Sequence, residues 1–334
     1  MINKIVRLCV LPVMYFIAFI GCDKREQNIA FPAAITDNVA EVATKSGLNT
    51  FAAAFKAARF DTAFDYLGQY TVFAPTDAAF TAAGINAGNL NAIPIEVLRG
   101  ILRNHILPGR TTALSFLPGP NAVYGNINRD FIYTSTYLST TPGVGSFAGV
   151  YFNGIKIVNV DLLANNGVIH TLDGLLLPAG GNLTTTLAAN PNLSFLNAAI
   201  ARAGLTTTLN TGTAAITLLA PNNAAFIAAG FPDIATINAA SPTTLSAILR
   251  LHVIPATGAT ATAGRLFSPD FRAGNYTTLN GTIATTVSGT IATFRGAGNT
   301  GAGAVVLTPN VLFRSLIASG APSVLHIVDR VLLP

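Results

Sequence analysis

The chain has 334 residues, of which 51% are hydrophobic and only 10% are charged. This length exceeds a typical single domain and suits two domains of about 150 residues, and the composition excludes a largely disordered protein. The 19 basic residues are scattered singly, with Lys24 and Arg25 as the only adjacent pair, and they are set against 14 acidic residues. A chain without a basic stripe is not expected to bind nucleic acid.

The N-terminus has the pattern of a secretory signal peptide. Lys4 and Arg7 precede an apolar stretch over residues 8–20, which is too short for a comfortable membrane span. The stretch ends in Phe19-Ile20-Gly21-Cys22, which resembles a bacterial lipobox, although Phe19 stands where Leu is usual. Removal of Lys4 and Arg7 with the leader leaves 17 basic against 14 acidic residues, a net charge of +3.

We therefore predict a bacterial lipoprotein with a signal peptide over residues 1–22, lipidation at Cys22 and a solvated spacer over residues 23–35. Cys9 lies within the segment to be removed, so Cys22 is the only mature thiol and no disulfide is expected. The alternative is an uncleaved anchor helix with an incidental cysteine.

An internal repeat organises the rest of the chain. Four pairs of similar segments recur in the same order, roughly 150 residues apart. The pairs are GLNTFAAAFKAARF (47–60) with NLSFLNAAIARAGL (192–205), TVFAPTDAAF (71–80) with TLLAPNNAAF (217–226), LRNHILPG (102–109) with LRLHVIPA (249–256), and GVIHTLDGLLLP (167–178) with SVLHIVDRVLLP (323–334). This spacing predicts a duplicated domain, with copies over residues 36–179 and 183–334.

Each copy is expected to have helices early and antiparallel strands late, which is an α+β fold. Residues 47–60 place apolar side chains at helical spacing, whereas 71–73 read as a short buried strand followed by a helix capped by Thr76 or Asp77. The dipeptides Asn153-Gly154 and Asn280-Gly281 predict hairpin turns. The final segments, 167–178 and 323–334, are predicted to be strands that end at a proline.

The four histidines all fall within the repeated segments, in equivalent pairs. His105 and His252 lie at the ends of predicted helices, and His170 and His326 lie in predicted strands. The first pair shares a face with leucines and isoleucines, so a core histidine satisfied by a hydrogen bond is one interpretation and a ligand-contacting residue is the other.

Catalytic and metal-binding patterns are weak. Two histidines per copy without a cysteine do not suffice for a metal site, and no cofactor motif is present. His170 with Asp173, and His326 with Asp329, suggest acid–base dyads, but residues three apart on a straight strand point to opposite faces.

Asp77 follows a buried strand, a place where catalytic carboxylates often lie, and its counterpart is Asn223. Because Asp and Asn are nearly equal as helix caps but an amide cannot act as a base, the pair is interpreted as structural.

At these segments the sequence resembles a tandem pair of fasciclin domains. TVFAPTDAAF and NGVIHTLDGLLLP are similar to the two homology boxes of that family, and LLAPNNAAF and VLHIVDRVLLP are looser copies. The resemblance covers about residues 36–334. It implies, for each copy, a wedge of about seven strands flanked by a cluster of helices, and a non-enzymatic role in binding proteins or glycans at a cell surface.

Some animal members of this family bind integrins through a Tyr-His pair between the two boxes. The matching positions here are Asn104-His105 and Leu251-His252, which makes these four residues the candidate ligand contacts implied by the resemblance. Because Tyr is absent from both, integrin-type binding itself is not transferred.

The favoured hypothesis is a lipid-anchored adhesion module, located at the outer membrane or cell surface, that binds a cell-surface or matrix protein or a polysaccharide. Two alternatives remain open. One is an inward-facing periplasmic scaffold lipoprotein that binds a partner protein, and the other is a hydrolase hidden in the longer second copy.

Overall fold

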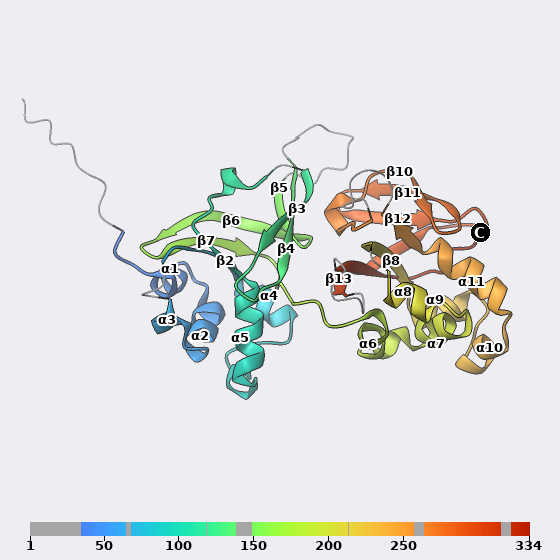
Figure 1. Cartoon of the computed structure of the whole chain (residues 1–334), viewed down its shortest axis with the longest axis horizontal. Helices are drawn as coiled ribbons and strands as arrows, with labels where there is room; N and C mark the ends of the chain where they lie inside the picture. Colours follow the sequence, from blue (N-terminus) through green and yellow to red (C-terminus); the bar gives the residue numbers. More distant parts are fainter. Residues whose placement is uncertain are drawn as a thin grey trace, which may run out of the picture. The chain divides into compact units, whose positions relative to one another are not determined.

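The computed structural model describes residues 35–64, 68–117, 119–137, 149–212, 214–256, 264–314 and 322–334, which form two domains of the same architecture (Figure 1). The helices of domain 1 are α1 (Val39–Lys45), α2 (Asn49–Ala57), α3 (Phe60–Ala63), α4 (Asp77–Ala82) and α5 (Ile95–Asn104), with the 3-10 turns η1 (Leu90–Ala92) and η2 (Ala113–Ser115). Its strands are β1 (Tyr70–Pro75), β2 (Ile106–Pro108), β3 (Gly119–Gly125), β4 (Phe131–Tyr137), β5 (Gly149–Phe152), β6 (Ile155–Ala164) and β7 (Gly167–Leu172).

Domain 2 repeats this order with an additional helix. Its helices are α6 (Leu183–Ala188), α7 (Ser194–Arg202), α8 (Thr206–Asn210), α9 (Asn223–Ala228), α10 (Ile234–Ala239) and α11 (Pro242–Leu251), with the 3-10 turns η3 (Pro191–Leu193) and η4 (Ser268–Asp270). Its strands are β8 (Ile216–Pro221), β9 (Val253–Pro255), β10 (Gly274–Thr278), β11 (Gly281–Ser288), β12 (Ile291–Arg295), β13 (Ala304–Phe313) and β14 (Ser323–Val328).

Each domain contains one seven-stranded sheet. The strand order is β2-β1-β7-β6-β5-β4-β3 in domain 1, and the equivalent order β9-β8-β14-β13-β12-β11-β10 is found in domain 2. The predicted α+β fold with about seven strands per copy is therefore confirmed. One pairing differs from the expected antiparallel arrangement, because β1 pairs with β7, and β8 with β14, in parallel.

Two local predictions about the strands have different outcomes. Asn153 and Gly154 form the two-residue hairpin between β5 and β6, with φ of 48° and 79°, as a turn of the primed type requires. The last strands, however, stop at Leu172 and Val328, well before the terminal prolines. Just after these strands, Asp173 and Asp329 accept hydrogen bonds from the backbone N–H groups of Lys156 and Val305, at the start of the neighbouring strand.

Apolar side chains cover both faces of each sheet. On the helical face of domain 1, α2 contributes Phe51 and Phe55 to a cluster that also holds Val72 of β1 and Ile169 of β7. A second cluster joins Leu107 of β2 to Ile132 of β4, although these strands lie far apart in the strand order. The sheet must therefore curl over to enclose this second core, and domain 2 has the same pair of clusters.

The parallel contact between β1 and β7 leaves no room for a side chain at Gly167. A Cβ atom built there would lie 2.4 Å from the Tyr70 carbonyl oxygen. We expect Gly167→Ala to lower the free energy of unfolding by about 1–3 kcal/mol, as overpacking does. Urea denaturation followed by circular dichroism measures this.

The matched control is Gly100→Ala in α5, where no atom beyond the neighbouring helix backbone lies within 4 Å of the added Cβ. Because alanine is the better helix former, this variant should gain about 0.5–1 kcal/mol. Equal stability of Gly167→Ala and the unsubstituted chain would contradict the tight strand contact.

Candidate functional site

The histidines at the helix ends link each helix to the C-terminal segment of its own domain. His105 donates through Nδ1 to the Ile101 carbonyl at 2.8 Å and accepts at Nε2 from the Leu176 N–H at 2.8 Å. His252 bonds in the same way to the Ile248 carbonyl and the Leu332 N–H, both at 2.9 Å. Each imidazole thus bridges two backbone groups, a carbonyl of the helix and an N–H of the segment after the last strand.

The strand histidines form a second equivalent pair. His170 donates through Nε2 to the Thr111 carbonyl at 2.9 Å, and its Nδ1 accepts from the Asp161 N–H at 3.3 Å. His326 donates to the Leu266 carbonyl at 2.7 Å and accepts from the Asn310 N–H at 3.3 Å.

Asp161 and Asn310 make these bonds from a left-handed backbone, with φ of 57° and 64°. They lie where β6 and β13 shift register, so the bulge directs an N–H toward the imidazole ring.

All four imidazoles are therefore neutral, because each ring uses one nitrogen as donor and the other as acceptor. Burial lowers the pKa of His105, His252 and His326 to about 4, and it also lowers the pKa of His170. The backbone carbonyl accepting from each ring opposes the shift but is the smaller effect. These histidines hold the fold together.

The four positions that match the family's integrin-binding pair lie in the core, contrary to the ligand-contact role that the resemblance implied. Exposure is 2% for Asn104, 1% for His105, 2% for Leu251 and 0% for His252. Asn104 donates to the Leu176 carbonyl and accepts from the side chain of Asn126, and Leu251 packs inside the second core of domain 2. A ligand cannot touch these side chains without local unfolding.

Asp77 and Asn223 share one structural role, which differs in detail from the predicted cap. The residue before each, Thr76 or Asn222, is the N-cap of α4 or α9. Asp77 instead accepts from the Thr50 N–H at 2.8 Å, in the first turn of α2, and Asn223 accepts from the Phe195 N–H at 3.0 Å, in the first turn of α7. An amide and a carboxylate do this equally well, because only an acceptor oxygen is needed.

The suspected His–Asp dyads are not formed by the residues that the sequence suggested. Asp173 and Asp329 accept from backbone N–H groups of Lys156 and Val305, at the starts of β6 and β13. The carboxylate nearest His170 is that of Asp161, 3.9 Å from Nδ1, a contact that the bulge in β6 creates and the sequence did not indicate. In domain 2 the same place holds Asn310, so this pair is not a shared acid–base device.

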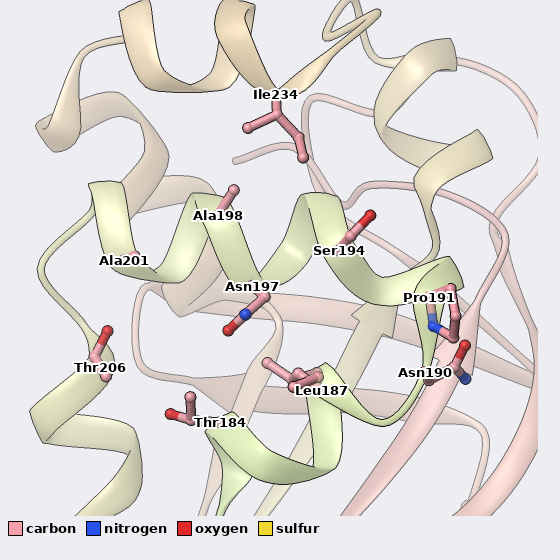
Figure 2. A pocket seen from close by; sticks show the side chains of 11 residues that line it. Thr184, Leu187, Asn190, Pro191, Ser194, Asn197, Ala198, Ala201, Thr206 and Ile234 are labelled. Carbon is pink, nitrogen blue, oxygen red and sulfur yellow. The ribbon is translucent and has the colours of Figure 1, made fainter.

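An open groove of about 470 Å³ runs along α7 on the helical side of domain 2 (Figure 2). One face of α7 contributes Ser194, Asn197, Ala198 and Ala201, at helical spacing. The other walls come from α6, η3, α8 and, on the opposite side, Ile234 of α10. All of these walls except Ile234 come from consecutive elements over residues 184–206, and no local pattern indicated the groove because the elements enclose it only once they are packed together.

The lining of the groove is uncharged. It combines short apolar side chains with hydroxyl and amide groups, and none of its residues is ionisable. Arg202, the one charged residue of α7, donates to the Ala240 carbonyl, and Asp233 caps α10 by accepting from Thr236. Such a surface offers hydrogen bonds and contact area without an electrostatic preference.

Domain 1 does not repeat this lining. In the repeated segments, Ala201 of α7 corresponds to the exposed Lys56 of α2. Where domain 2 has α10, domain 1 has only the three-residue turn η1. The groove is thus a feature in which the two copies have diverged.

Within the described ranges, no three His, Cys, Asp or Glu side chains gather in a way that would hold a metal ion. No described helix combines the length and apolarity needed to cross a membrane. Cys22 and the predicted signal peptide lie outside the described residues.

Fold and site together define a tandem pair of α+β domains with structural histidines and an uncharged surface groove. A family model described as Fasciclin domain matches residues 46–178 and 191–334. The chain belongs to the fasciclin family, whose domains are in general non-enzymatic adhesion and extracellular interaction modules.

Curated relatives share this sequence over part of their length. Transforming growth factor-beta-induced protein ig-h3 of Sus scrofa is 34% identical over 197 residues, which span 58% of this chain and 27% of that protein. Periostin of Homo sapiens is 30% identical over 189 residues, spanning 55% and 21%. Protein sll1483 of Synechocystis sp. is 29% identical over 170 residues, spanning 48% and 87%. The match thus covers only about a quarter of the length of ig-h3 and of periostin.

A solved structure of a FAS1 domain pair from the insect cell adhesion molecule fasciclin I is also similar. It shares 16% identity with a TM-score of 0.38, over 87% of this chain and 98% of that one.

The buried histidines predict acid sensitivity. Their pKa is lower in the folded chain, about 4 for His105, His252 and His326, than the ordinary 6.5, so the unfolded chain binds protons more tightly. Their contribution to the free energy of unfolding is complete above about pH 6.5 and falls as the pH drops toward 4. At pH 5 the loss is about 2 kcal/mol for each of the three.

Urea denaturation at pH 7 and pH 5 measures this loss. His252→Gln serves as the control, because it should be less stable at pH 7 yet show a shallower pH dependence. Identical stability of the unsubstituted chain at both pH values would rule out neutral, buried imidazoles.

The cap across helices predicts different results for two substitutions of Asp77. Asp77→Asn keeps the acceptor oxygen for the Thr50 N–H and should leave stability nearly unchanged, whereas Asp77→Ala should cost about 1 kcal/mol. Thermal unfolding of both variants makes the comparison. If the Asn variant lost as much as the Ala variant, the carboxylate charge would have a role that Asn223 does not share.

Proposed function

We propose that this chain is a lipid-anchored adhesion module of a bacterial cell envelope, facing outward from the outer membrane or cell surface. It binds a cell-surface or matrix protein or a polysaccharide and catalyses no reaction. The observation that carries this proposal is that, in domain 2, the histidines are buried whereas uncharged polar side chains are exposed in a groove. The histidines of domain 2 are buried with both ring nitrogens engaged, while an uncharged groove is open on the helical face.

The histidine geometry favours binding over catalysis in domain 2. A general base must reach the proton of a bound substrate, but His252 and His326 are each 0% exposed. Hydrolysis by either histidine would require the fold to open first. Binding at the groove needs no such opening, because hydroxyl and amide groups already line it.

The sequence of residues 1–35 supports the anchor. A basic start, a short apolar stretch and Gly21-Cys22 are the features of a lipoprotein signal, and the spacer leads into α1, which starts at Val39. A single lipidated residue followed by a polar spacer holds a folded module close to the membrane surface without a membrane-spanning helix.

Deletion of the gene should reduce attachment to surfaces and biofilm formation, and the unsubstituted gene should restore both. The Cys22→Ala chain should leave the membrane fraction and fail to restore attachment, because a folded module without its anchor is lost from the surface. Attachment assays and membrane fractionation measure these outcomes. Unchanged attachment in the deletion strain would contradict an adhesive role.

Protease treatment of intact cells distinguishes the outward-facing module from an inward-facing scaffold. Cleavage of the chain on intact cells supports the surface location. Protection until the outer membrane is permeabilised would favour the periplasmic scaffold that binds a partner protein.

A further inference from the structure

The groove along α7 contains neutral hydroxyl and amide groups that are free to form further hydrogen bonds. The side chains of Asn197 and Thr206 make no hydrogen bond within the described residues. Thr184 and Ser194 accept from the amides of Asn210 and Asn223, which leaves each hydroxyl hydrogen free to donate. Asn190 accepts from the Asn192 N–H through Oδ1, which leaves its NH₂ group free. These groups are neutral, and they can donate and accept.

The same lining lacks the features that give protein partners their binding energy. Hot spots at protein interfaces are mostly Trp, Tyr and Arg in desolvated pockets, and bound peptides insert side chains into apolar pockets or extend a sheet edge. No aromatic or charged residue lines the groove, and its walls are helices rather than strand edges. The α7 face instead presents Ala198 and Ala201, which leave space without forming a deep pocket.

We propose that this groove binds an uncharged segment of a polysaccharide chain. This inference rests on the adhesive function proposed above and names the ligand of domain 2. Hydroxyl groups of a neutral sugar donate and accept hydrogen bonds as the lining does, and they bring no charge that would have to be desolvated. An acidic polysaccharide would lose the hydration of its carboxylates or sulfates without meeting a cation in the groove.

The groove geometry also predicts how tightly the ligand is held. Without an aromatic ring for stacking, one groove gains only neutral hydrogen bonds, each of which contributes about 1 kcal/mol net. Binding to a short oligosaccharide should therefore be weak. Many copies of an anchored chain on one surface, meeting a polymer with many equivalent segments, convert weak contacts into firm attachment.

The test measures binding of the purified full-length chain in detergent micelles to immobilised polysaccharides. The probes are dextran and galactomannan as neutral polymers, alginate as an acidic polymer and gelatin as a polypeptide. Ala201→Trp fills the groove from an exposed position, and Asn197→Leu removes the free amide at similar volume. Lys56→Trp is the matched control, because it places the same ring at the equivalent position of α2 in domain 1.

We expect at least one neutral polymer to bind, with little dependence on salt. Ala201→Trp and Asn197→Leu should each weaken that binding by about tenfold, whereas Lys56→Trp should not. The ligand assignment is overturned if neither neutral polymer binds, or if a neutral polymer binds all variants alike. It is also overturned if gelatin or alginate, rather than a neutral polymer, loses binding in Ala201→Trp.

Attachment of cells separates this inference from the proposed function. If the deletion strain loses attachment but a strain carrying Ala201→Trp attaches normally, adhesion stands and the groove assignment fails. If deletion leaves attachment unchanged while the purified chain binds a neutral polymer through the groove, the ligand assignment stands and the adhesive role fails. Every variant must have the same circular dichroism spectrum as the unsubstituted chain, which shows that it is folded.

Discussion

Each domain depends on imidazole rings that replace backbone hydrogen bonds where no regular element can supply them. In domain 1, His105 connects the last turn of α5 to the segment after β7, and His170 connects a bulge of β6 to the loop before η2. A buried ring satisfies two distant backbone groups at once, which an apolar side chain in the same place would leave unpaired. Burial then keeps the ring neutral, so these hydrogen bonds persist until the pH is low enough to protonate the imidazole.

This use of histidine has a consequence for function. The residue type best suited to proton transfer near neutral pH is buried in both domains, with no free nitrogen. Recognition is left to groups on the surface. In domain 2 the helical face offers neutral hydroxyls and amides beside small apolar residues, which can donate and accept hydrogen bonds at the surface.

The two copies show which features the fold requires and which it leaves free to diverge. Asp77 and Asn223 differ in charge, yet both cap a helix that begins far from them in the sequence. Asp161 and Asn310 likewise occupy the same left-handed position opposite a histidine. At these positions an acceptor oxygen or a backbone conformation matters, and the charge does not. On the face of α7 and α2, by contrast, Ala201 corresponds to Lys56, because that face is not constrained by a core.

The sequence by itself determined the duplication, the α+β class, the hairpin at Asn153-Gly154 and the family, because these depend on local patterns and on repeated segments. Tertiary structure alone decided the parallel pairing of β1 with β7 and the burial of Asn104 and His105. The sequence pattern of a strand does not reveal which strand it pairs with. A residue at the edge of the apolar face of a helix can be either a core residue or a ligand-contacting residue, and only its tertiary neighbours decide between the two. The groove was also beyond local patterns, since its walls come from segments that meet only in the folded domain.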